Sequence, residues 1–331
     1  MPIFGKKQSK KMTRLFFATD IHGSERTYRK FINAGKFYDV NVLVMGGDIS
    51  GKLMIPIIRE SNGHYRATLQ GTVHQLTTQE ELKQLHDRIG LLGFYGQLMD
   101  EDEYKELADR PEQVDQLFHK LARERLSSWI DLAETRLKGT GIRCFVTGGN
   151  DDDPEVLAAM QGGGRESFFA CEGEVVQVDD QHTMASVGFS NPTPWKTPRE
   201  IPDEKLGKII EEMCAKVTDF EHCIFNFHVP PLDSTLDSCP KLDWNTDPPT
   251  PIVSGGQIVF AGAGSQSVKD AIVKHQPMLG LHGHIHESQG VIKIGRTTCI
   301  NPGSEYGEGI LRGCLVTFAD GGIEGFQMTS G

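Results

Sequence analysis

The sequence lacks any run of about 18 consecutive apolar residues, the length that a membrane-spanning helix needs. Its seven cysteines stand far apart and form no CxxC pair, so neither a zinc ribbon nor a disulfide framework is indicated. Basic residues are also few, 34 against 45 acidic ones, which gives a net charge of −11. This balance argues against a surface for a nucleic acid polymer, and the scattered thiols favour a cytoplasmic location.

The overall composition is typical of a globular protein. With 331 residues, 38% of them hydrophobic and 24% charged, the chain can bury a sizeable core. We treat residues 1–331 as a single domain that begins with a basic arm, residues 1–12, rich in lysine. The arm lacks the apolar centre of a secretory signal, and we expect it to be solvated.

Short apolar runs followed by polar loops recur along the chain and predict buried strands. These runs lie within residues 13–20, 40–48, 141–153, 221–231 and 276–288. Helical patterns occupy residues 24–35, with Ser24 as N-cap and Gly35 as stop, and residues 203–217. Such alternation predicts a layered α/β domain whose functional groups collect at the carboxyl ends of strands.

The C-terminal half predicts further strands separated by turns. We expect residues 166–190, 290–304 and 313–329 to contribute to a second, partly antiparallel sheet packed on the first. The last of these segments reads as a hairpin about Asp320, Gly321 and Gly322.

Residues 62–139 interrupt this pattern and predict an insertion. Residues 62–76 favour a loop or hairpin, and the segment is mainly helical from about residue 79. Pro111 suits a first helical turn and Gly139 a stop. A stripe at helical spacing predicts core packing; it comprises Leu126, Trp129, Ile130, Ala133 and Leu137.

Polar side chains that can bind metal ions follow the predicted strands. They are Asp20, His22, Asp48, Asn150, His228, His284 and His286. Mixed nitrogen and oxygen donors suit divalent ions such as Mn²⁺, Fe²⁺, Zn²⁺, Co²⁺ or Ni²⁺. The set is too large for one tetrahedral site but is sufficient for two ions if a carboxylate bridges them. Asp48 is the natural bridge because the preceding glycines let backbone and ions approach closely.

Each of these signals has an ordinary structural reading when it stands alone. An aspartate two residues before a histidine is often a cap, a Gly-Gly-Asp run is often a turn, and a single histidine is often a core residue. Five such signals in order, each at the end of a strand, favour a shared metal centre.

The ordered motifs resemble those of the calcineurin-like metallophosphoesterases. They are DIH (20–22), GGD (46–48), GGND (148–151), FHVPP (227–231) and GHIH (283–286). Other stretches are similar to the Icc-related branch of predicted phosphoesterases, among them NPTPWKTPRE, PPLDSTLD and INPGSEYGEG. The resemblance covers nearly the whole chain apart from the basic arm and the insertion.

The resemblance implies an α/β/β/α sandwich of two sheets with a dinuclear metal centre, Mn²⁺ being the first choice of ion. One ion would be held by Asp20, His22, Asp48 and His286. The other would be held by Asp48, Asn150, His228 and His284. Gly283 would permit the tight approach of the last loop, whereas His282 is expected in the strand or behind the ligands.

The implied reaction is hydrolysis of a phosphoester. Two ions can clamp phosphoryl oxygens and lower the pKa of a water between them, so Asp48, Asn150 and His228 are also assigned to the catalytic set. Asp151, the last of this set, stands where many relatives have a histidine that assists the leaving group. An ionised carboxylate there would repel a phosphate dianion more than a diester, which favours a phosphodiesterase.

Other readings stay open. The runner-up activity is a phosphomonoesterase, including a protein phosphatase, and a non-catalytic interaction module on the same fold is the rival from another class. The substrate would be a small phosphoester or a nucleotide. Asn191, Asn301 and Ser304 are candidate substrate contacts, although a purely structural turn is the more common role for such residues.

Overall fold

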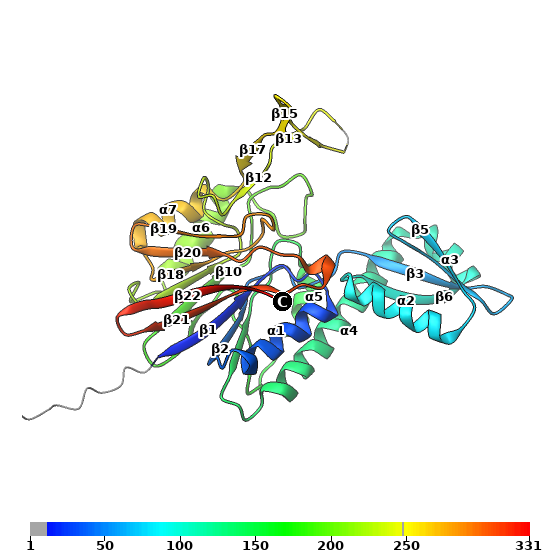
Figure 1. Cartoon of the computed structure of the whole chain (residues 1–331), viewed down its shortest axis with the longest axis horizontal. Helices are drawn as coiled ribbons and strands as arrows, with labels where there is room; N and C mark the ends of the chain where they lie inside the picture. Colours follow the sequence, from blue (N-terminus) through cyan, green and yellow to red (C-terminus); the bar gives the residue numbers. More distant parts are fainter. Residues whose placement is uncertain (1–11, 247) are drawn as a thin grey trace, which may run out of the picture.

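The computed structural model describes residues 12–246 and 248–331, so the predicted basic arm lies outside the described residues apart from Met12. Two six-stranded sheets form the body (Figure 1). The first contains, in order, β22 (Gly322–Ser330), β21 (Arg312–Ala319), β1 (Thr13–Ala18), β2 (Val42–Met45), β7 (Arg143–Val146) and β8 (Phe168–Ala170). The second contains β19 (Gly290–Ile294), β20 (Thr297–Asn301), β18 (Leu279–Leu281), β11 (Cys223–Phe227), β10 (Thr183–Val187) and β9 (Val175–Gln177).

Parallel strands occupy the centre of both sheets. In the first sheet β1 pairs with β2, and β2 with β7, all in parallel. In the second sheet β10, β11, β18 and β20 pair in parallel, and antiparallel strands close both edges. The carboxyl ends of the central strands in each sheet therefore lie along one edge, where their loops can meet.

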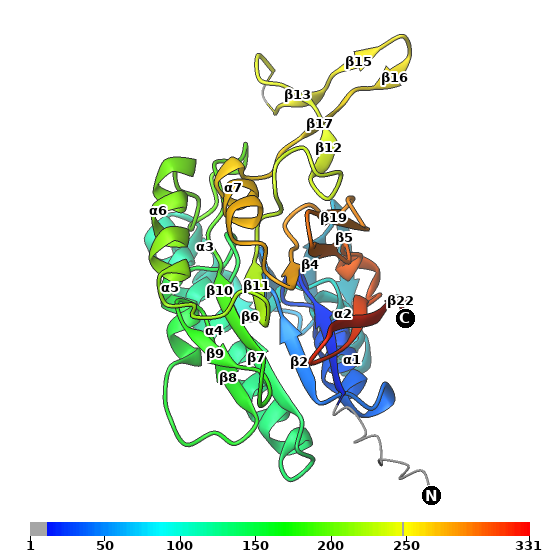
Figure 2. The ribbon, with the colours of Figure 1, turned by 90° about the vertical axis from the view of Figure 1, so that its left-hand side faces the viewer.

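The alternation of side chains on the strands separates three core layers. Phe16 of β1 points to a cluster shared with helices on the outer face, whereas Phe17 points to the cluster between the two sheets. The outer helices of the first sheet are α1 (Glu25–Phe37) and α4 (Pro111–Leu137), followed by α5 (Pro154–Leu157) and the 3-10 helix η1 (Ala158–Met160). The second sheet is covered by α6 (Asp203–Cys214) and α7 (Gln266–His275) (Figure 2). The predicted α/β/β/α sandwich is confirmed.

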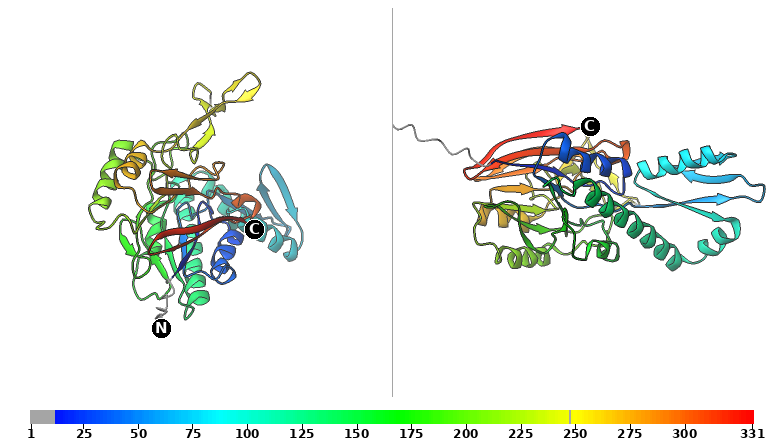
Figure 3. Two further views of the ribbon diagram at one scale, coloured as in Figure 1. Left: turned by 60° about the vertical axis from the view of Figure 1, so that its left-hand side comes forward. Right: turned by 90° about the horizontal axis from the view of Figure 1, so that it is seen from below.

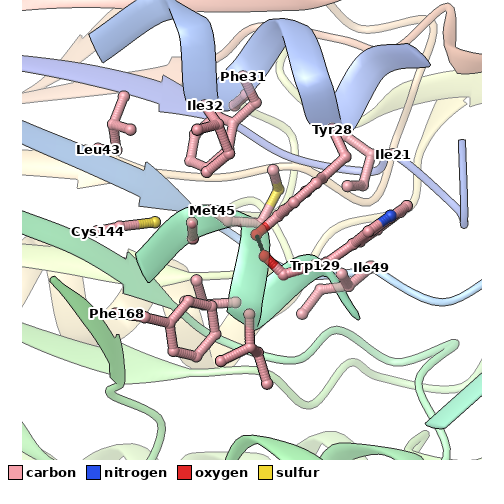
Figure 4. Packing of buried hydrophobic residues seen from close by; sticks show 14 of the residues in the cluster. Ile21, Tyr28, Phe31, Ile32, Leu43, Met45, Ile49, Trp129, Cys144 and Phe168 are labelled. Carbon is pink, nitrogen blue, oxygen red and sulfur yellow. Dashed lines mark hydrogen bonds between the residues drawn. The ribbon is translucent and has the colours of Figure 1, made fainter. Parts of the chain in front are cut away.

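The long helix α4 fits the predicted stripe closely. It begins at Pro111 and ends at Leu137, and all five predicted stripe residues are buried. Trp129 stacks on Tyr28 of α1 with ring centroids 4.1 Å apart (Figure 4). The Tyr28 hydroxyl donates a 2.8 Å hydrogen bond to the Trp129 carbonyl, which ties α4 to α1.

Three expectations about individual elements were wrong. Helix α1 continues past Gly35 to Phe37, because Gly35 lies on the buried face, where a Cβ would be 3.2 Å from Ile142. The C-terminal hairpin β21–β22 and strand β8, both expected in the second sheet, join the first sheet instead. Conversely, β11 and β18 belong to the second sheet. An apolar run predicts a strand but does not reveal its pairing partners.

Residues 54–108 form a small α/β unit that extends away from the body, whereas α4, which was expected within the insertion, packs on the first sheet (Figure 3). The four-stranded sheet of this unit has the order β5 (Thr72–Leu76), β4 (Tyr65–Leu69), β3 (Met54–Arg59) and β6 (Tyr95–Asp100), with helices α2 (Gln79–Leu91) and α3 (Glu101–Ala108). The hairpin β4–β5 lies within the expected residues 62–76. The structure differs in adding β3, upstream of residue 62, and β6. The sequence pattern did not predict these strands because their pairing with each other is parallel and non-local.

Glycine backbone joins this unit to the body. A Cβ at Gly51 would lie 1.9 Å from the Gly93 carbonyl oxygen, and one at Gly93 would lie 2.0 Å from the His22 carbonyl oxygen. Arg125 of α4 donates to the carbonyls of Gly23 and Phe94 at 2.8 and 2.9 Å. The unit is therefore packed directly against the loop that follows β1.

A second projection, residues 238–262, leaves the body on another side (Figures 1 and 2). It consists of three two-stranded pairs: β12 (Ser238–Pro240) with β17 (Phe260–Gly262), β13 (Leu242–Asp243) with β14 (Thr250–Pro251), and β15 (Val253–Ser254) with β16 (Gln257–Ile258). The 3-10 helix η2 (Tyr306–Glu308) completes the elements of the described chain. Among the helices that the structure describes, none is both long and apolar enough for a membrane span.

Candidate metal centre

The predicted ligands come from five loops at the carboxyl ends of β1, β2, β7, β11 and β18, three strands in one sheet and two in the other. The loops are tied together by backbone hydrogen bonds, including those from His22 N to Asp48 O at 2.9 Å and from Gly283 N to His228 O at 2.8 Å. Four of the ligands have left-handed backbone conformations, with positive φ; they are Asp20, His22, Asp48 and His284. Strained backbone of this kind persists where the surrounding structure imposes it, commonly at functional sites.

The first cluster consists of Asp20, His22 and His286. The Nε2 atoms of the two histidines lie 3.1 Å apart, and His286 Nε2 lies 3.3 Å from Asp20 Oδ1. One donor atom from each of the three residues lies within 4.8 Å of the others. The donors therefore converge on one point, as the ligands of a single ion do.

The second cluster consists of Asp48, His228 and His284, with Asn150 between the rings. Asn150 Oδ1 lies 3.0 Å from His228 Nε2 and 2.7 Å from His284 Nδ1. His228 Nε2 is also 3.4 Å from Asp48 Oδ2. This set again offers two imidazoles, a carboxylate and an amide oxygen around one point.

Asp48 connects the two clusters. Its Oδ2 lies 3.4 Å from His228 Nε2 in the second cluster and 3.7 Å from His22 Nε2 in the first. A single carboxylate therefore faces ligands of both sets, which is the position predicted for the bridge.

Glycines permit this crowding. A Cβ on Gly283 would lie 2.3 Å from Asp20 Oδ2, and one on Gly149 would lie 2.1 Å from Asp48 Oδ1. A Cβ on Gly47 would lie 2.5 Å from His228 Nδ1, and Gly47 also has a φ of +121°. Any side chain at these positions would displace a ligand.

The groups behind the ligands fix their orientation. His228 Nδ1 donates to the Gly46 carbonyl at 2.9 Å, which turns Nε2 toward the cluster. The Asn150 amide nitrogen donates to Thr197 Oγ1 at 2.8 Å, which aims its oxygen at the two rings. Thr197 in turn donates to Glu200 Oε1 at 2.8 Å.

Thr197→Val should therefore weaken ion binding at the second cluster. The substitution keeps the shape of the side chain but removes the acceptor that orients Asn150, and losses of this kind cost about 10- to 100-fold in metal affinity. A competition titration with a chelating dye measures the change. Thr193→Val is the matched control, because Thr193 donates to the same Glu200 but does not contact Asn150. Equal losses of metal affinity in both variants would mean that Thr197 only stabilises its loop and does not orient Asn150.

The centre contains buried carboxylates and histidines that shift the pKa values of one another. Burial acts to raise the pKa of Asp20 and Asp48, but neighbouring histidines outweigh it and lower both below the usual value. Burial likewise acts to lower the pKa of His228, yet the charge of Asp48 raises it to about 9. Burial lowers the pKa of His284 to about 4, so that ring is neutral.

These properties fit a pair of divalent cations. The two ionised carboxylates are only 1% and 3% exposed, and the Nε2 atoms of His22 and His286 face each other 3.1 Å apart. Ions there would bind such converging nitrogens and offset the buried negative charge. The donor set contains no thiolate and suits Mn²⁺, Fe²⁺, Zn²⁺, Co²⁺ or Ni²⁺.

The remaining sequence candidates occupy different places. His282 is fully buried, with Nδ1 2.8 Å from the Phe227 carbonyl, and belongs to neither cluster. Asn301 is also fully buried and directs its amide nitrogen at the carbonyls of Gly283 and Ile285, at 3.2 and 3.0 Å. Asn301 therefore supports the histidine loop instead of facing a substrate.

The other two substrate candidates are partly exposed. Ser304 donates to the Asp20 carbonyl at 2.6 Å, which places it next to the first cluster. Asn191 donates to the Ala263 carbonyl at 3.3 Å, and its amide oxygen is buried without a partner. The substrate contacts assigned to these two residues stay predictions.

Three further residues near the centre carry no motif signal of their own. Lys52 Nζ lies 2.9 Å from Asp151 Oδ2, and the Tyr306 ring lies 4.7 Å from the His22 ring. The Asp152 carboxylate is completely buried and accepts hydrogen bonds from the backbone of Ser50 and Gly149, joining the loops after β2 and β7. The one feature of the sequence that could have pointed to Lys52 is its position four residues after Asp48.

Comparisons with known proteins give sequence relatives only at a distance. No family model matches the chain. The uncharacterized protein MJ1162 of Methanocaldococcus jannaschii is 26% identical over 156 residues. That match covers 46% of this chain and 61% of the relative, so the chain spans less than two thirds of the relative's length.

The chain is also similar to solved structures across most of its length. One crystal structure has a TM-score of 0.52 and 13% identity, and the match covers 96% of this chain and 99% of that one. TT1561 of Thermus thermophilus has a TM-score of 0.49 and 11% identity, covering 93% and 99%. An archaeal phosphodiesterase has a TM-score of 0.33 and 10% identity, covering 96% and 99%. The likeness to the first structure, at 13% identity, concerns the fold alone.

Proposed function

We propose that the protein is a metal-dependent phosphoester hydrolase, and more specifically a phosphodiesterase that acts on a small phosphodiester or a nucleotide. The observation that carries the proposal is the position of Asp48, whose Oδ2 faces His22 of one cluster and His228 of the other within 3.7 Å. Two divalent ions, when bound, supply Lewis-acid polarisation of the phosphoryl group and a water of lowered pKa.

The chain would contribute position and charge to this chemistry. Asp20, His22, Asp48 and His286 would hold one ion, and Asp48, Asn150, His228 and His284 the other. The buried carboxylates remain ionised, so they are ready as ligands. His228 Nε2 must be free of its proton when it binds an ion, and the hydrogen bond from Nδ1 to Gly46 keeps the ring in place.

The preference for a diester rests on Asp151. Its Oδ2 lies 3.5 Å from His22 Nδ1 and 2.9 Å from Lys52 Nζ, so a carboxylate and an ammonium share the border of the centre. The pair has no net charge, so it does not compensate the second negative charge of a phosphate monoester. A phosphate monoanion, such as a diester, suits it better than a monoester dianion.

Turnover of matched aryl substrates tests the preference. With Mn²⁺ supplied, we expect kcat/KM for bis(p-nitrophenyl) phosphate to exceed that for p-nitrophenyl phosphate by about tenfold or more, since tenfold corresponds to about 1.4 kcal/mol of transition-state stabilisation. A strong monoester preference would instead favour the phosphomonoesterase reading. A protein that holds no stoichiometric transition metal and hydrolyses neither substrate would be an interaction module.

We further propose Mn²⁺ as the first choice of ion and the cytoplasm as the location. All seven cysteines are free, and six of them are buried, which suits a reducing compartment.

A further inference from the structure

The metal centre is mostly buried, and a few exposed side chains mark the side on which it reaches solvent. Asp20, Asp48 and His228 are almost inaccessible, whereas the side chains of His286 and Asp151 are 29% and 18% exposed. The side chain of Lys52 is 41% exposed. A substrate that reaches the centre must arrive past these more exposed groups.

Lys52 is held at this open side by an ion pair that is itself attached to the ligands. Lys52 Nζ lies 2.9 Å from Asp151 Oδ2, and the same oxygen is 3.5 Å from His22 Nδ1. The Asp151 backbone N–H also donates to Asp48 Oδ1 at 2.9 Å. The pair is therefore fixed to both clusters, unlike an ordinary surface ion pair, which is worth little.

The three residues that precede Lys52 are held by hydrogen bonds to other loops. The Asp152 carboxylate accepts hydrogen bonds from the backbone of Ile49 and Ser50 at 2.7 to 3.1 Å. The Gly51 N–H donates to the Tyr95 hydroxyl at 2.7 Å. Because this backbone is already ordered, the Lys52 ammonium loses little conformational entropy when a ligand binds, which favours affinity for the ligand.

We propose that Lys52 binds a phosphoryl oxygen of the substrate and that Asp151 holds the ammonium in place for this contact. An ammonium has three N–H donors, and Asp151 engages one side of it, so donors remain for a phosphate oxygen. The proposal rests on the proposed function, since it assigns a residue to the recognition of a phosphoester at the same centre.

The pair also accounts for an acidic residue beside a phosphate site. Asp151 alone would repel the substrate, but combined with Lys52 it supplies a directed donor with no net charge. Lys52 and Asp151 are then specificity residues: the pair tolerates a singly charged phosphate and gives little compensation for a second charge.

Binding of inorganic phosphate to the Mn²⁺-loaded protein tests this contact by isothermal titration calorimetry, with metal content measured beside it. Lys52→Met should raise the Kd for phosphate by about 10- to 100-fold, the size of one charge-assisted hydrogen bond, and leave the metal content unchanged. Lys52→Arg should keep affinity within several-fold of the wild type. Lys138→Met is the matched control, because Lys138 pairs with Glu166 away from the centre.

A double variant separates direct contact from simple neutralisation of Asp151. If Lys52 touches phosphate, Lys52→Met combined with Asp151→Asn should bind phosphate as weakly as Lys52→Met alone. Recovery of wild-type affinity in the double variant would overturn the proposal, as would unchanged affinity in Lys52→Met or no phosphate binding by the wild type. Hydrolysis by the wild type with unchanged phosphate binding in Lys52→Met would leave the proposed function intact, whereas absence of metal and hydrolysis in the wild type would remove it.

Discussion

Asp48→Ala is expected to abolish stoichiometric metal binding and to reduce kcat/KM by more than about a thousandfold, or about 4 kcal/mol of transition-state stabilisation. The substitution removes the carboxylate between the two clusters, which lies 3.4 Å from His228 and 3.7 Å from His22. It also leaves the buried His228 beside one negative charge fewer, which disfavours the charged ring. Metal analysis and turnover, measured on the same preparation, check the expectation.

A second aspartate–histidine pair provides the control. Asp179 Oδ1 lies 2.8 Å from His182 Nδ1, next to the start of β10 and so at the opposite end of the strands from the centre. Asp179→Ala removes a comparable ion pair and should keep metal content and turnover per folded molecule. Wild-type metal stoichiometry in Asp48→Ala would refute the site assignment.

Gly283→Ala should be nearly as damaging, although it adds a single methyl group. The new Cβ would lie 2.3 Å from both Asp20 Oδ2 and Thr19 Oγ1, so the ligand or the loop must move. Overpacking of this kind costs about 1–3 kcal/mol of stability, and a displacement of about 1 Å at a catalytic centre can cost about a hundredfold in rate. Thermal unfolding and a metal titration together separate the two effects.

Gly163→Ala is the matched control for this methyl group. Gly163 has no atom within 4 Å of its virtual Cβ and has no positive φ, so alanine there should leave stability and activity close to those of the wild type. If Gly283→Ala bound metal as tightly as Gly163→Ala does, close approach of the loop would not be needed at the centre.

The sequence predicts the residues of the two clusters more completely than the sheets that carry them. Asp20, Asp48 and His228 follow apolar runs within three residues, and burial of those runs is a local property that the sequence pattern predicts. The pairing of β21 with β1 is a contact between opposite ends of the chain, and hydrophobic pattern contains no information on it. The sandwich was predictable, and the membership of its two sheets was not.

The residues around the ligands were harder to find for a related reason. Thr197 acts on Asn150 across 47 positions, and Lys52 meets Asp151 across a whole inserted unit. Neither contact has a periodic or spaced signature. Asn301 shows the opposite difficulty: a turn-like Asn-Pro-Gly-Ser run suggested a substrate contact, whereas its amide nitrogen donates to backbone carbonyls in the interior.

The glycine-lined seam between the inserted unit and the loop after β1 limits how this protein can be re-engineered. Ser24 Oγ reaches the Leu91 carbonyl at 2.8 Å, and Arg125 bridges Gly23 to Phe94. Excising residues 54–100 to obtain a smaller protein would remove these supports from the segment just beyond His22. A shortened protein would therefore need other contacts to hold that segment before His22 could bind an ion. The inserted unit thus supports the structure of the centre and cannot simply be removed.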